Sequence, residues 1–320
     1  MKPDVLRRTA LLLDYHMPMR LPTAPAANAV KLRGDYSSAN SDYVVEQSWG
    51  DYTSAEHALW GRLLQRQFRL IEKYGAPQVL AGLKALHIDD HVPRFDEASK
   101  VLRAATGWEI VAVPGLIPEQ NFFAHLAKRH FPVTVWLRTP EEIDYLSEPD
   151  VFHDFFGHVP LLCDPVFGDF MQAYGEAGRK ASAEGGLKML ARLYWYCVEF
   201  GLIKTEGGLR AYGAGILSSA GETVYCIESP SPHRIGFDLE RVMRTDYLID
   251  DYQKTYFVMD SFEQLFRNAY DRDFAPIYRA YRDTPGWPPD SIFPADNVVT
   301  RGTQGATAAA PAAGAAGVAR

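Results

Sequence analysis

The sequence predicts a mainly helical protein with a few short β-strands. Apolar side chains recur at helical spacing in several long stretches, for example at Leu59, Leu63 and Ile71. Strand-like stretches are few and short, and they cover residues 108–113, 131–137 and 255–259. Of the 320 residues, 47% are hydrophobic and 12% aromatic, so the chain can bury the core of one domain or of two.

Composition narrows the class of partner. A net charge of −7 and an isoelectric point near 5.7 argue against a nucleic-acid partner, which normally requires a basic face, so we expect a small substrate. No apolar run reaches the roughly 18 residues of a membrane helix, and Leu11 to Leu13 is too short for a signal-peptide core. Cys163, Cys197 and Cys226 lack CxxC spacing, so we expect free thiols and a cytoplasmic protein.

The first part of the chain is expected to form an extended arm followed by helices. Residues 1–45 contain several prolines and no sustained period. Thr53 and Glu56 form a capping box that begins the first helix, and Pro77 to Leu86 has the pattern of the next. The HIDDH stretch at residues 87–91 could be a second metal site or a solvated loop.

Two strand-like segments flank a loop rich in glycine and proline. Trp108 to Val113 is followed by the loop at residues 114–118 and by a helix that carries Phe122. The strand from Phe131 to Leu137 is expected to deliver Arg138 at its end, before the capping box of residues 139–142. Arg138 could bind a carboxylate ligand through two hydrogen bonds or form a surface salt bridge.

Two histidines stand in an apolar, helix-like stretch. Ser147 is the expected N-cap of this helix, and Asp150 completes a capping box. In a regular helix the five-residue step from His153 to His158 would separate the side chains by about 140°. Gly157 and Pro160 allow the helix to distort or end and to turn both imidazoles toward one ion, although either histidine could instead be a core residue. The four-residue step of HExxH zinc peptidases is absent from this motif.

The best candidate for a third ligand is Glu199, in the apolar helical stretch at residues 191–200. No basic side chain is its neighbour in sequence, and a carboxylate buried in this way must be paired, protonated or bound to a metal. Two imidazoles and one carboxylate leave open positions on iron(II), the arrangement of non-haem iron oxygenases. Zinc hydrolases also use two histidines and a glutamate, so the ligands alone do not decide the metal.

The remaining elements follow in order. We expect a helix from Asp164 to about residue 183, a helix over residues 239–244, and one long helix over residues 261–281. Residues 211–222 are rich in glycine, alanine and serine and leave space at their surface, without a phosphate-loop pattern. Residues 299–320 end in alanine, glycine and proline and are expected to be disordered.

Three motifs carry a family resemblance. The segments EPDVFHDFFGHVPLL, LYWYCVEFGL and AYGAGILSSAGE, in this order, resemble the pterin-dependent aromatic amino acid hydroxylases, in particular their short bacterial members. The resemblance covers roughly residues 40–285. It implies a single catalytic domain at residues 46–298, without the regulatory domain or the tetramer-forming helix of animal members, and therefore a monomer.

The resemblance also implies the roles of individual residues. The iron(II) ligands would be His153, His158 and Glu199. The reduced tetrahydropterin would lie along Gly115, Leu116 and Ile117, stack on Phe122, and approach Asp154 and Tyr194. The amino acid substrate would contact Arg138, Trp195, Ser218, Gly215 and Pro149. Ser219 and Glu222 would support the histidines by hydrogen bonds.

The implied reaction is the hydroxylation of phenylalanine to tyrosine with dioxygen and the pterin. Ile249 is apolar where tyrosine hydroxylases place a carboxylate, and Trp195 stands where tryptophan hydroxylases have a smaller ring. Tryptophan 5-hydroxylation is the alternative within the family. A hydrolase with the same ligands and a non-catalytic protein that binds pterin or amino acid are the alternatives outside it.

Overall fold

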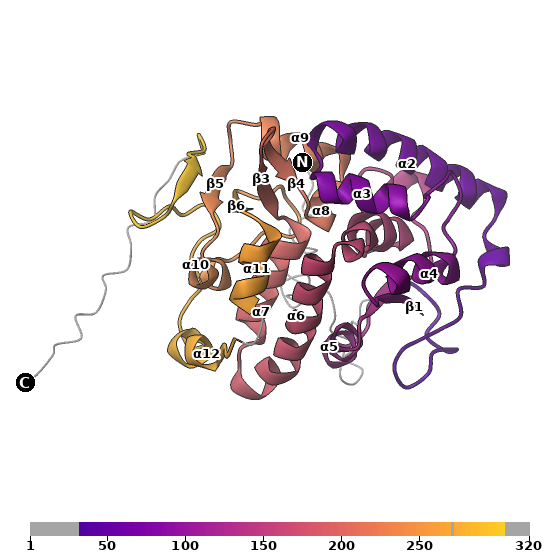
Figure 1. Ribbon diagram of the computed structural model, residues 1–320, viewed down its shortest axis with the longest axis horizontal. Helices are drawn as coiled ribbons and strands as arrows, with labels where there is room; N and C mark the ends of the chain where they lie inside the picture. The colour runs from indigo at the N-terminus through magenta and orange to yellow at the C-terminus, as the bar shows by residue number, and fades with distance from the viewer. Residues whose placement is uncertain (1–31, 270–271, 305–320) are drawn as a thin grey trace, which may run out of the picture.

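The computed structural model describes residues 32–269 and 272–304, which form a helical body around a small mixed sheet. Figure 1 shows the N-terminal helices on one side of the molecule, the larger sheet on the other, and α6 and α7 between them. The α-helices are α2 (Ser54–Tyr74), α3 (Pro77–Ala85), α4 (Phe95–Ala105), α5 (Glu119–Ala127), α6 (Pro165–Glu184), α7 (Leu187–Tyr194), α8 (Ala214–Leu217), α9 (Ala220–Glu228), α10 (Leu239–Arg244), α11 (Phe262–Ala269) and α12 (Ala275–Tyr281). The mainly helical fold with short strands is thus confirmed.

Shorter helical turns and the strands complete the fold. Two π-helices cover Phe152–His158 and Trp195–Glu199, and short 3₁₀ turns cover Trp49–Asp51, Pro140–Glu142 and Val159–Cys163. The strands are β1 (Glu109–Val113), β2 (His130–Thr134), β3 (Leu202–Thr205), β4 (Gly208–Ala211), β5 (His233–Gly236), β6 (Thr255–Met259) and β7 (Val298–Thr300). Strands β1 and β2 pair in parallel, and the other five form a mixed sheet in the order β4-β3-β6-β5-β7.

Local sequence signals explain where several helices begin. The Thr53 side chain accepts a hydrogen bond from the Glu56 N–H and the Glu56 carboxylate accepts from the Thr53 N–H, so the predicted capping box begins α2. Asp164 accepts from two backbone N–H groups at the start of α6, and Pro165 occupies the first turn. No helix within the described residues has the length and apolar character needed to cross a bilayer.

The expected long helix over residues 261–281 is wrong. The structure has two helices, α11 and α12, and residues 272–274 between them are not helical. Asp273 accepts a hydrogen bond from the Ala275 N–H, and Pro276 stands in the first turn of α12. Proline is favoured in a first turn but has no N–H for the middle of a helix, which explains the break.

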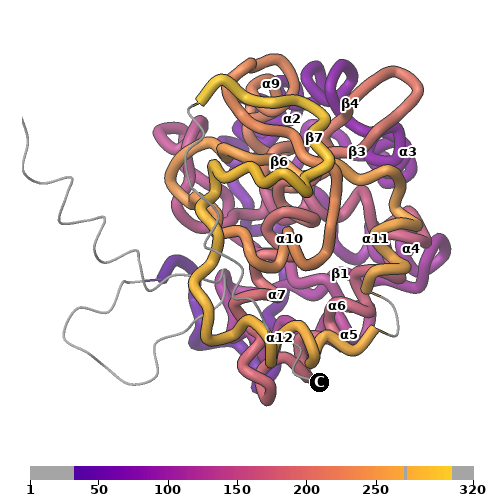
Figure 2. Tube along the Cα trace, turned by 90° about the vertical axis from the view of Figure 1, so that its left-hand side faces the viewer, coloured from indigo at the N-terminus to yellow at the C-terminus, as the bar shows by residue number. Residues whose placement is uncertain are grey.

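Two other boundaries differ from expectation. The strand predicted to run to Leu137 ends at Thr134, so Arg138 lies in the loop that follows. The expected disordered tail starts too early, because β7 pairs with β5 and the Gly302 N–H donates to His233 Nδ1 at 2.8 Å. Figure 2 shows this C-terminal segment lying along the outside of the sheet. The arm at residues 1–31 and the tail at 305–320 lie outside the described residues.

A buried ion pair fixes the C-terminal segment to α10. Arg241 Nε donates to Asp296 at 2.9 Å, and the side chains are 6% and 5% exposed. We expect Asp296→Ala to lower the free energy of unfolding by about 3–5 kcal/mol, because the Arg241 charge stays buried without its partner. Urea unfolding measures this loss. The matched control is Glu240→Ala, which breaks the partly exposed Arg244–Glu240 pair and should cost about 1 kcal/mol or less. Equal losses of unfolding free energy in the two variants would show that the buried Arg241–Asp296 pair does not have this special role.

Candidate metal centre and substrate pocket

A cavity of about 430 Å³ opens beside the two π-helices. The π-helices contribute His153, Asp154, His158, Trp195 and Glu199 to its lining. Two loops, named for the ligands that the family resemblance implies, form other parts of the wall: the cofactor-side loop, residues 114–118, contributes Leu116 and Ile117, and the substrate-side loop, residues 139–149, contributes residues 144–149. A cavity of this volume can hold small organic molecules.

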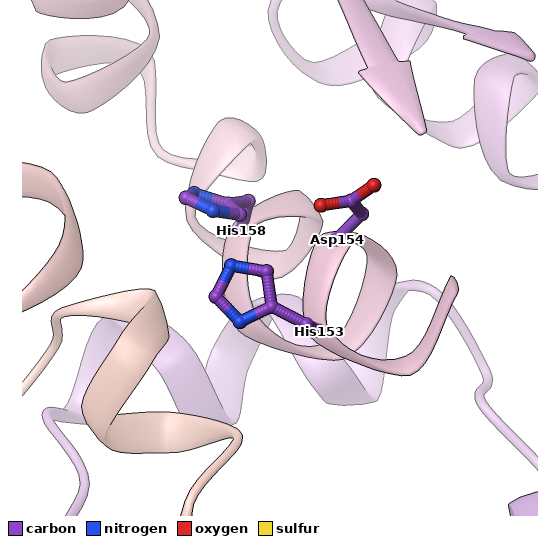
Figure 3. Close-up of side chains that lie close together, drawn as sticks. All are labelled: His153, Asp154 and His158. Atoms are coloured by element: carbon purple, nitrogen blue, oxygen red, sulfur yellow. The ribbon is translucent and has the colours of Figure 1, made fainter. Parts of the chain in front are cut away.

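The first π-helix brings His153 and His158 to the same side of the chain despite their five-residue spacing. Hydrogen bonds in a π-helix join residues five apart, so His153 and His158 come onto neighbouring positions of one face. Their ring centroids are 5.1 Å apart, and Figure 3 shows the two imidazoles side by side. The predicted distortion of this helix is confirmed. Gly157 lets α8 pack closely against this turn, because a Cβ at residue 157 would lie 2.9 Å from the carbonyl oxygen of Ala214.

The second π-helix brings Glu199 to both histidines. Its Oε2 lies 3.6 Å from His153 Nε2, and its Oε1 lies 3.2 Å from His158 Nε2. Two ligands about 2.1 Å from one ion and at right angles would be about 3 Å apart, so this donor set fits a first-row metal ion. Asp154 also offers an oxygen within 4.8 Å of both imidazoles, but its Oδ2 already accepts the Thr134 N–H at 2.8 Å.

Charges at the site agree with metal ligation. Burial lowers the pKa of His153 to about 4, so its imidazole is neutral at physiological pH. For Glu199, burial acts to raise the pKa, but the two histidines outweigh it and hold the pKa below its ordinary value. The site therefore presents neutral imidazole nitrogen and a carboxylate anion, the forms that bind a divalent cation.

A serine orients the first histidine. His153 Nδ1 lies 2.9 Å from Ser218 Oγ, and the Ser218 hydroxyl donates to the Ala214 carbonyl at 2.9 Å. Because that hydroxyl proton is used, Ser218 accepts from His153 Nδ1–H, which leaves the Nε2 lone pair for a metal. The expected support of the histidines by Ser219 and Glu222 is wrong. Ser219 caps α9, and Glu222 Oε1 instead accepts from the Tyr256 hydroxyl at 2.5 Å and the Gln253 N–H at 3.1 Å.

Arg138 is buried in a two-point ion pair beside the cavity. Its Nε and Nη2 each donate to an oxygen of Asp150 at 2.8 Å, and the guanidinium lines the cavity. Asp150 also accepts the His153 N–H at 2.9 Å. The prediction that Ser147 is the N-cap is therefore wrong. Residues 147–150 are not helical, and Asp150 itself caps the turn that carries His153. One carboxylate thus orients both Arg138 and the first π-helix.

Most of the residues that the resemblance places at the pterin line the cavity. Leu116, Ile117, Phe122 and Tyr194 line the cavity, with the Phe122 and Tyr194 rings edge to face at 5.8 Å. Gly115 is not among the lining residues. Its φ is +156°, and a Cβ there would lie 2.9 Å from the Tyr36 hydroxyl, so it faces the N-terminal segment instead.

The opposite wall is aromatic. Trp195 stacks on Tyr247 with ring centroids 4.3 Å apart and donates from Nε1 to Gln253 Oε1 at 3.0 Å. Ile249, on the same loop as Tyr247, lines the cavity. Gly215 and Pro149 also line it, and the Gly215 N–H donates to Glu199. Glycine at 215 is required, because a Cβ would lie 2.8 Å from the Phe200 ring.

The comparisons with known proteins agree with this site. Residues 28–282 match the family model described as biopterin-dependent aromatic amino acid hydroxylase. The chain belongs to this family. The phenylalanine-4-hydroxylase of Chromobacterium violaceum is 55% identical to this hydroxylase over 263 residues, which cover 82% of this chain and 88% of that protein.

Two solved structures of the Chromobacterium violaceum protein are similar to this hydroxylase. One holds iron and phenylalanine; it has a TM-score of 0.78 and 54% identity, with 82% of this chain and 96% of that chain covered. The other holds iron(III) and 7,8-dihydrobiopterin; it has a TM-score of 0.79 and 55% identity, with 82% and 95% covered. The family membership predicted from the three motifs is confirmed.

Sequence reasoning missed three residues of this hydroxylase's site. Tyr247 and Gln253 hold Trp195, and Asp150 holds Arg138. Asp150 could have been found from the sequence, because an arginine that is expected to be buried needs an acidic partner. The HIDDH stretch lies at the surface, where Asp89, Asp90 and His91 are exposed, as expected for a solvated loop.

Removal of the Ser218 hydroxyl tests its orienting role. We expect Ser218→Ala to weaken iron(II) binding by about 10- to 100-fold, because His153 loses the partner that fixes its tautomer. Anaerobic titration against a competing chelator measures the affinity. Ser219→Ala is the matched control: it removes the α9 cap and about 1 kcal/mol of stability but should leave iron affinity unchanged. The assignment fails if the two variants bind iron equally well.

Glu222 gives the stability of the metal-free protein a pH dependence. Burial raises the pKa of Glu222 from 4.5 to about 7, so the folded state favours the protonated carboxyl. The contribution of this carboxyl to the free energy of unfolding is fully present below pH 4.5 and is lost as pH rises through 7. We expect the free energy of unfolding of Glu222→Gln to rise relative to that of the wild type as the pH increases from 5 to 8, by up to about 3 kcal/mol. Urea unfolding at the two pH values measures the gain, and a constant difference between the proteins would contradict it.

Proposed function

We propose that this protein hydroxylates L-phenylalanine to L-tyrosine with dioxygen and a reduced tetrahydropterin at a single iron(II) ion. One observation carries the proposal: two imidazoles and a carboxylate converge at a cavity that is also lined by a buried arginine and by the cofactor-side loop. The relatives named phenylalanine-4-hydroxylase support the same substrate.

His153, His158 and Glu199 are the proposed iron ligands. When bound, iron(II) and the reduced pterin supply the electrons and the open coordination positions that activate dioxygen for insertion of one oxygen atom into the ring. The protein holds the ligands in place: Ser218 fixes the tautomer of His153, and the Gly215 N–H donates to Glu199.

Arg138 is the proposed binding site for the substrate carboxylate. Asp150 fixes the plane of its guanidinium, and an oriented guanidinium pairs well with a carboxylate. Pro149 and Ser218 also line the cavity. Trp195, stacked on Tyr247, then forms a rigid wall for the aromatic ring, so the ring is positioned relative to the metal by two fixed groups.

The cofactor-side loop and its neighbours are the proposed pterin site. Leu116 and Ile117 offer apolar contact, and Phe122 offers a ring face for a flat heterocycle. Burial raises the pKa of the Asp154 carboxyl to about 7, so it can accept or donate a hydrogen bond near neutral pH. Tyr194, whose pKa burial raises well above its ordinary value, remains a neutral hydroxyl.

Phenylalanine is the proposed substrate among the aromatic amino acids. Ile249 places an apolar side chain at the cavity, and a substrate hydroxyl there would lose its hydrogen bonds with water. Trp195 lines the cavity with a large ring where tryptophan hydroxylases have a smaller one. Both features support a benzene ring over the ring of tyrosine or tryptophan.

The test is product formation by the loaded enzyme. Protein prepared without oxygen and loaded with iron(II) is mixed with phenylalanine, a tetrahydropterin and oxygen, and tyrosine is measured by chromatography. We expect tyrosine only when iron and pterin are both present, and less 5-hydroxytryptophan from tryptophan under the same conditions. Iron bound with no tyrosine formed would reject the proposal, whereas preferential hydroxylation of tryptophan would revise the substrate.

A ligand variant is the matched control. Glu199→Ala should lose iron binding and tyrosine formation together, because the remaining two imidazoles hold iron weakly. Its far-ultraviolet circular dichroism should stay that of the wild type. Full activity in this variant would show that Glu199 is not a ligand and would direct attention to Asp154.

We further propose that the protein acts as a monomer in the cytoplasm. Three free cysteines, Cys163, Cys197 and Cys226, support a reducing compartment. The exposed large apolar side chains of the described residues lie on α2, on β7 and in two loops, and two of them, Tyr145 and Ile249, line the cavity. Light scattering after gel filtration measures the mass, and a dimer mass would reject the monomer.

A further inference from the structure

The segment Arg33–Tyr36, called the brace below, lies between the two loops that line the cavity. None of its four residues is part of the cavity lining. Its contacts nevertheless reach the substrate-side loop at one end and the cofactor-side loop at the other. It is therefore placed to influence the distance between the two loops without touching a ligand.

Arg33 contacts two residues of the substrate-side loop and Trp136, which precedes that loop. Its Nη1 donates to both carboxylate oxygens of Glu142 at 2.8 Å, and its guanidinium lies 4.1 Å from the centre of the Trp136 ring. Its backbone N–H donates to Glu148 Oε2 at 3.3 Å. Glu148 lines the cavity and precedes Pro149, so the contact reaches the wall of the site itself.

Tyr36 and the brace backbone hold the cofactor-side loop. The Tyr36 hydroxyl donates to the Leu116 carbonyl at 2.9 Å, and Leu116 lines the cavity. Gly34 has a φ of +93°, and a Cβ there would lie 1.8 Å from the Pro114 carbonyl oxygen. Gly115 faces the brace from the other side, since a Cβ there would lie 3.0 Å from the Arg33 carbonyl oxygen. Two backbones approach closely here, as only glycine allows.

We propose that Arg33 and Tyr36 are positioning residues that set the spacing of the phenylalanine and pterin subsites. The inference rests on the proposed function for the identity of the two ligands. Arg33 acts on the amino acid side through Glu142 and Glu148, and Tyr36 acts on the pterin side through Leu116. Each residue therefore has its own expected kinetic signature.

The test uses full-length, iron-loaded variants and both Michaelis constants. We expect Arg33→Ala to raise the KM for phenylalanine by about three- to tenfold and to leave the KM for tetrahydropterin within about twofold, as expected for one or two lost hydrogen bonds. Tyr36→Phe removes only the hydroxyl and should raise the KM for pterin by a similar factor instead. Arg33→Lys keeps the charge, so its KM for phenylalanine should lie between those of Arg33→Ala and the wild type.

Ser37→Ala is the matched control, because the Ser37 side chain contacts Asp35 at the surface and neither loop. It should change neither constant. The proposal is overturned if Arg33→Ala and Tyr36→Phe alter both constants equally, or neither. Equal effects with an equal fall in melting temperature would show a merely structural role.

A second measurement does not depend on activity. Hydrogen exchange of the metal-free protein should show faster exchange at residues 142–149 in Arg33→Ala and at 116–117 in Tyr36→Phe, with α6 unchanged. Unchanged exchange in both loops overturns the proposal. If the wild type makes no tyrosine, the proposed function fails, yet exchange still decides whether the brace holds the loops.

Discussion

The site depends on two turns of π-helix that meet inside the core. In a regular helix, His153 and His158 would point in different directions, and the i→i+5 pattern brings them onto one face. The Glu199 turn shows the same pattern, with the Phe200 N–H donating to the Trp195 carbonyl. Isolated π-turns are poor helices, so tertiary packing must hold them. Buried aromatic rings of other elements supply that packing to the first turn, such as Trp60 of α2, whose ring centroid lies 5.2 Å from that of Phe152.

The pKa values of three buried carboxyl groups that line the cavity shift in opposite directions. Glu199 faces two imidazoles, and their attraction exceeds the cost of burial, so its pKa falls below the ordinary value. Asp154 and Glu222 are buried too, but His158 and the Thr134 N–H do not offset burial at Asp154, nor do Tyr256 and Gln253 at Glu222, and both pKa values rise to about 7. Of these three buried carboxyls, only Glu199 therefore has a pKa below its ordinary value.

Much of the fold could be predicted because its signals are local. The capping box at Thr53, the Asp164-Pro165 start of α6 and the apolar period of α2 each act within one or two turns of chain. Strands β3, β4, β5 and β7 were missed, because each has only three or four residues. Such short strands are stabilised by pairing with distant segments, as β3 pairs with β6, and carry little alternation of their own.

The metal ligands could be proposed from the chain, but the partners of those ligands could not. Ser218 and Ser219 are adjacent serines with the same chemistry, and only the backbone separates their roles. Ser218 follows the last turn of α8, so its hydroxyl returns to the Ala214 carbonyl four residues earlier and faces His153. Ser219 has an extended backbone and opens α9 instead. A difference of one residue in where a four-residue helix ends therefore decides which serine orients the ligand.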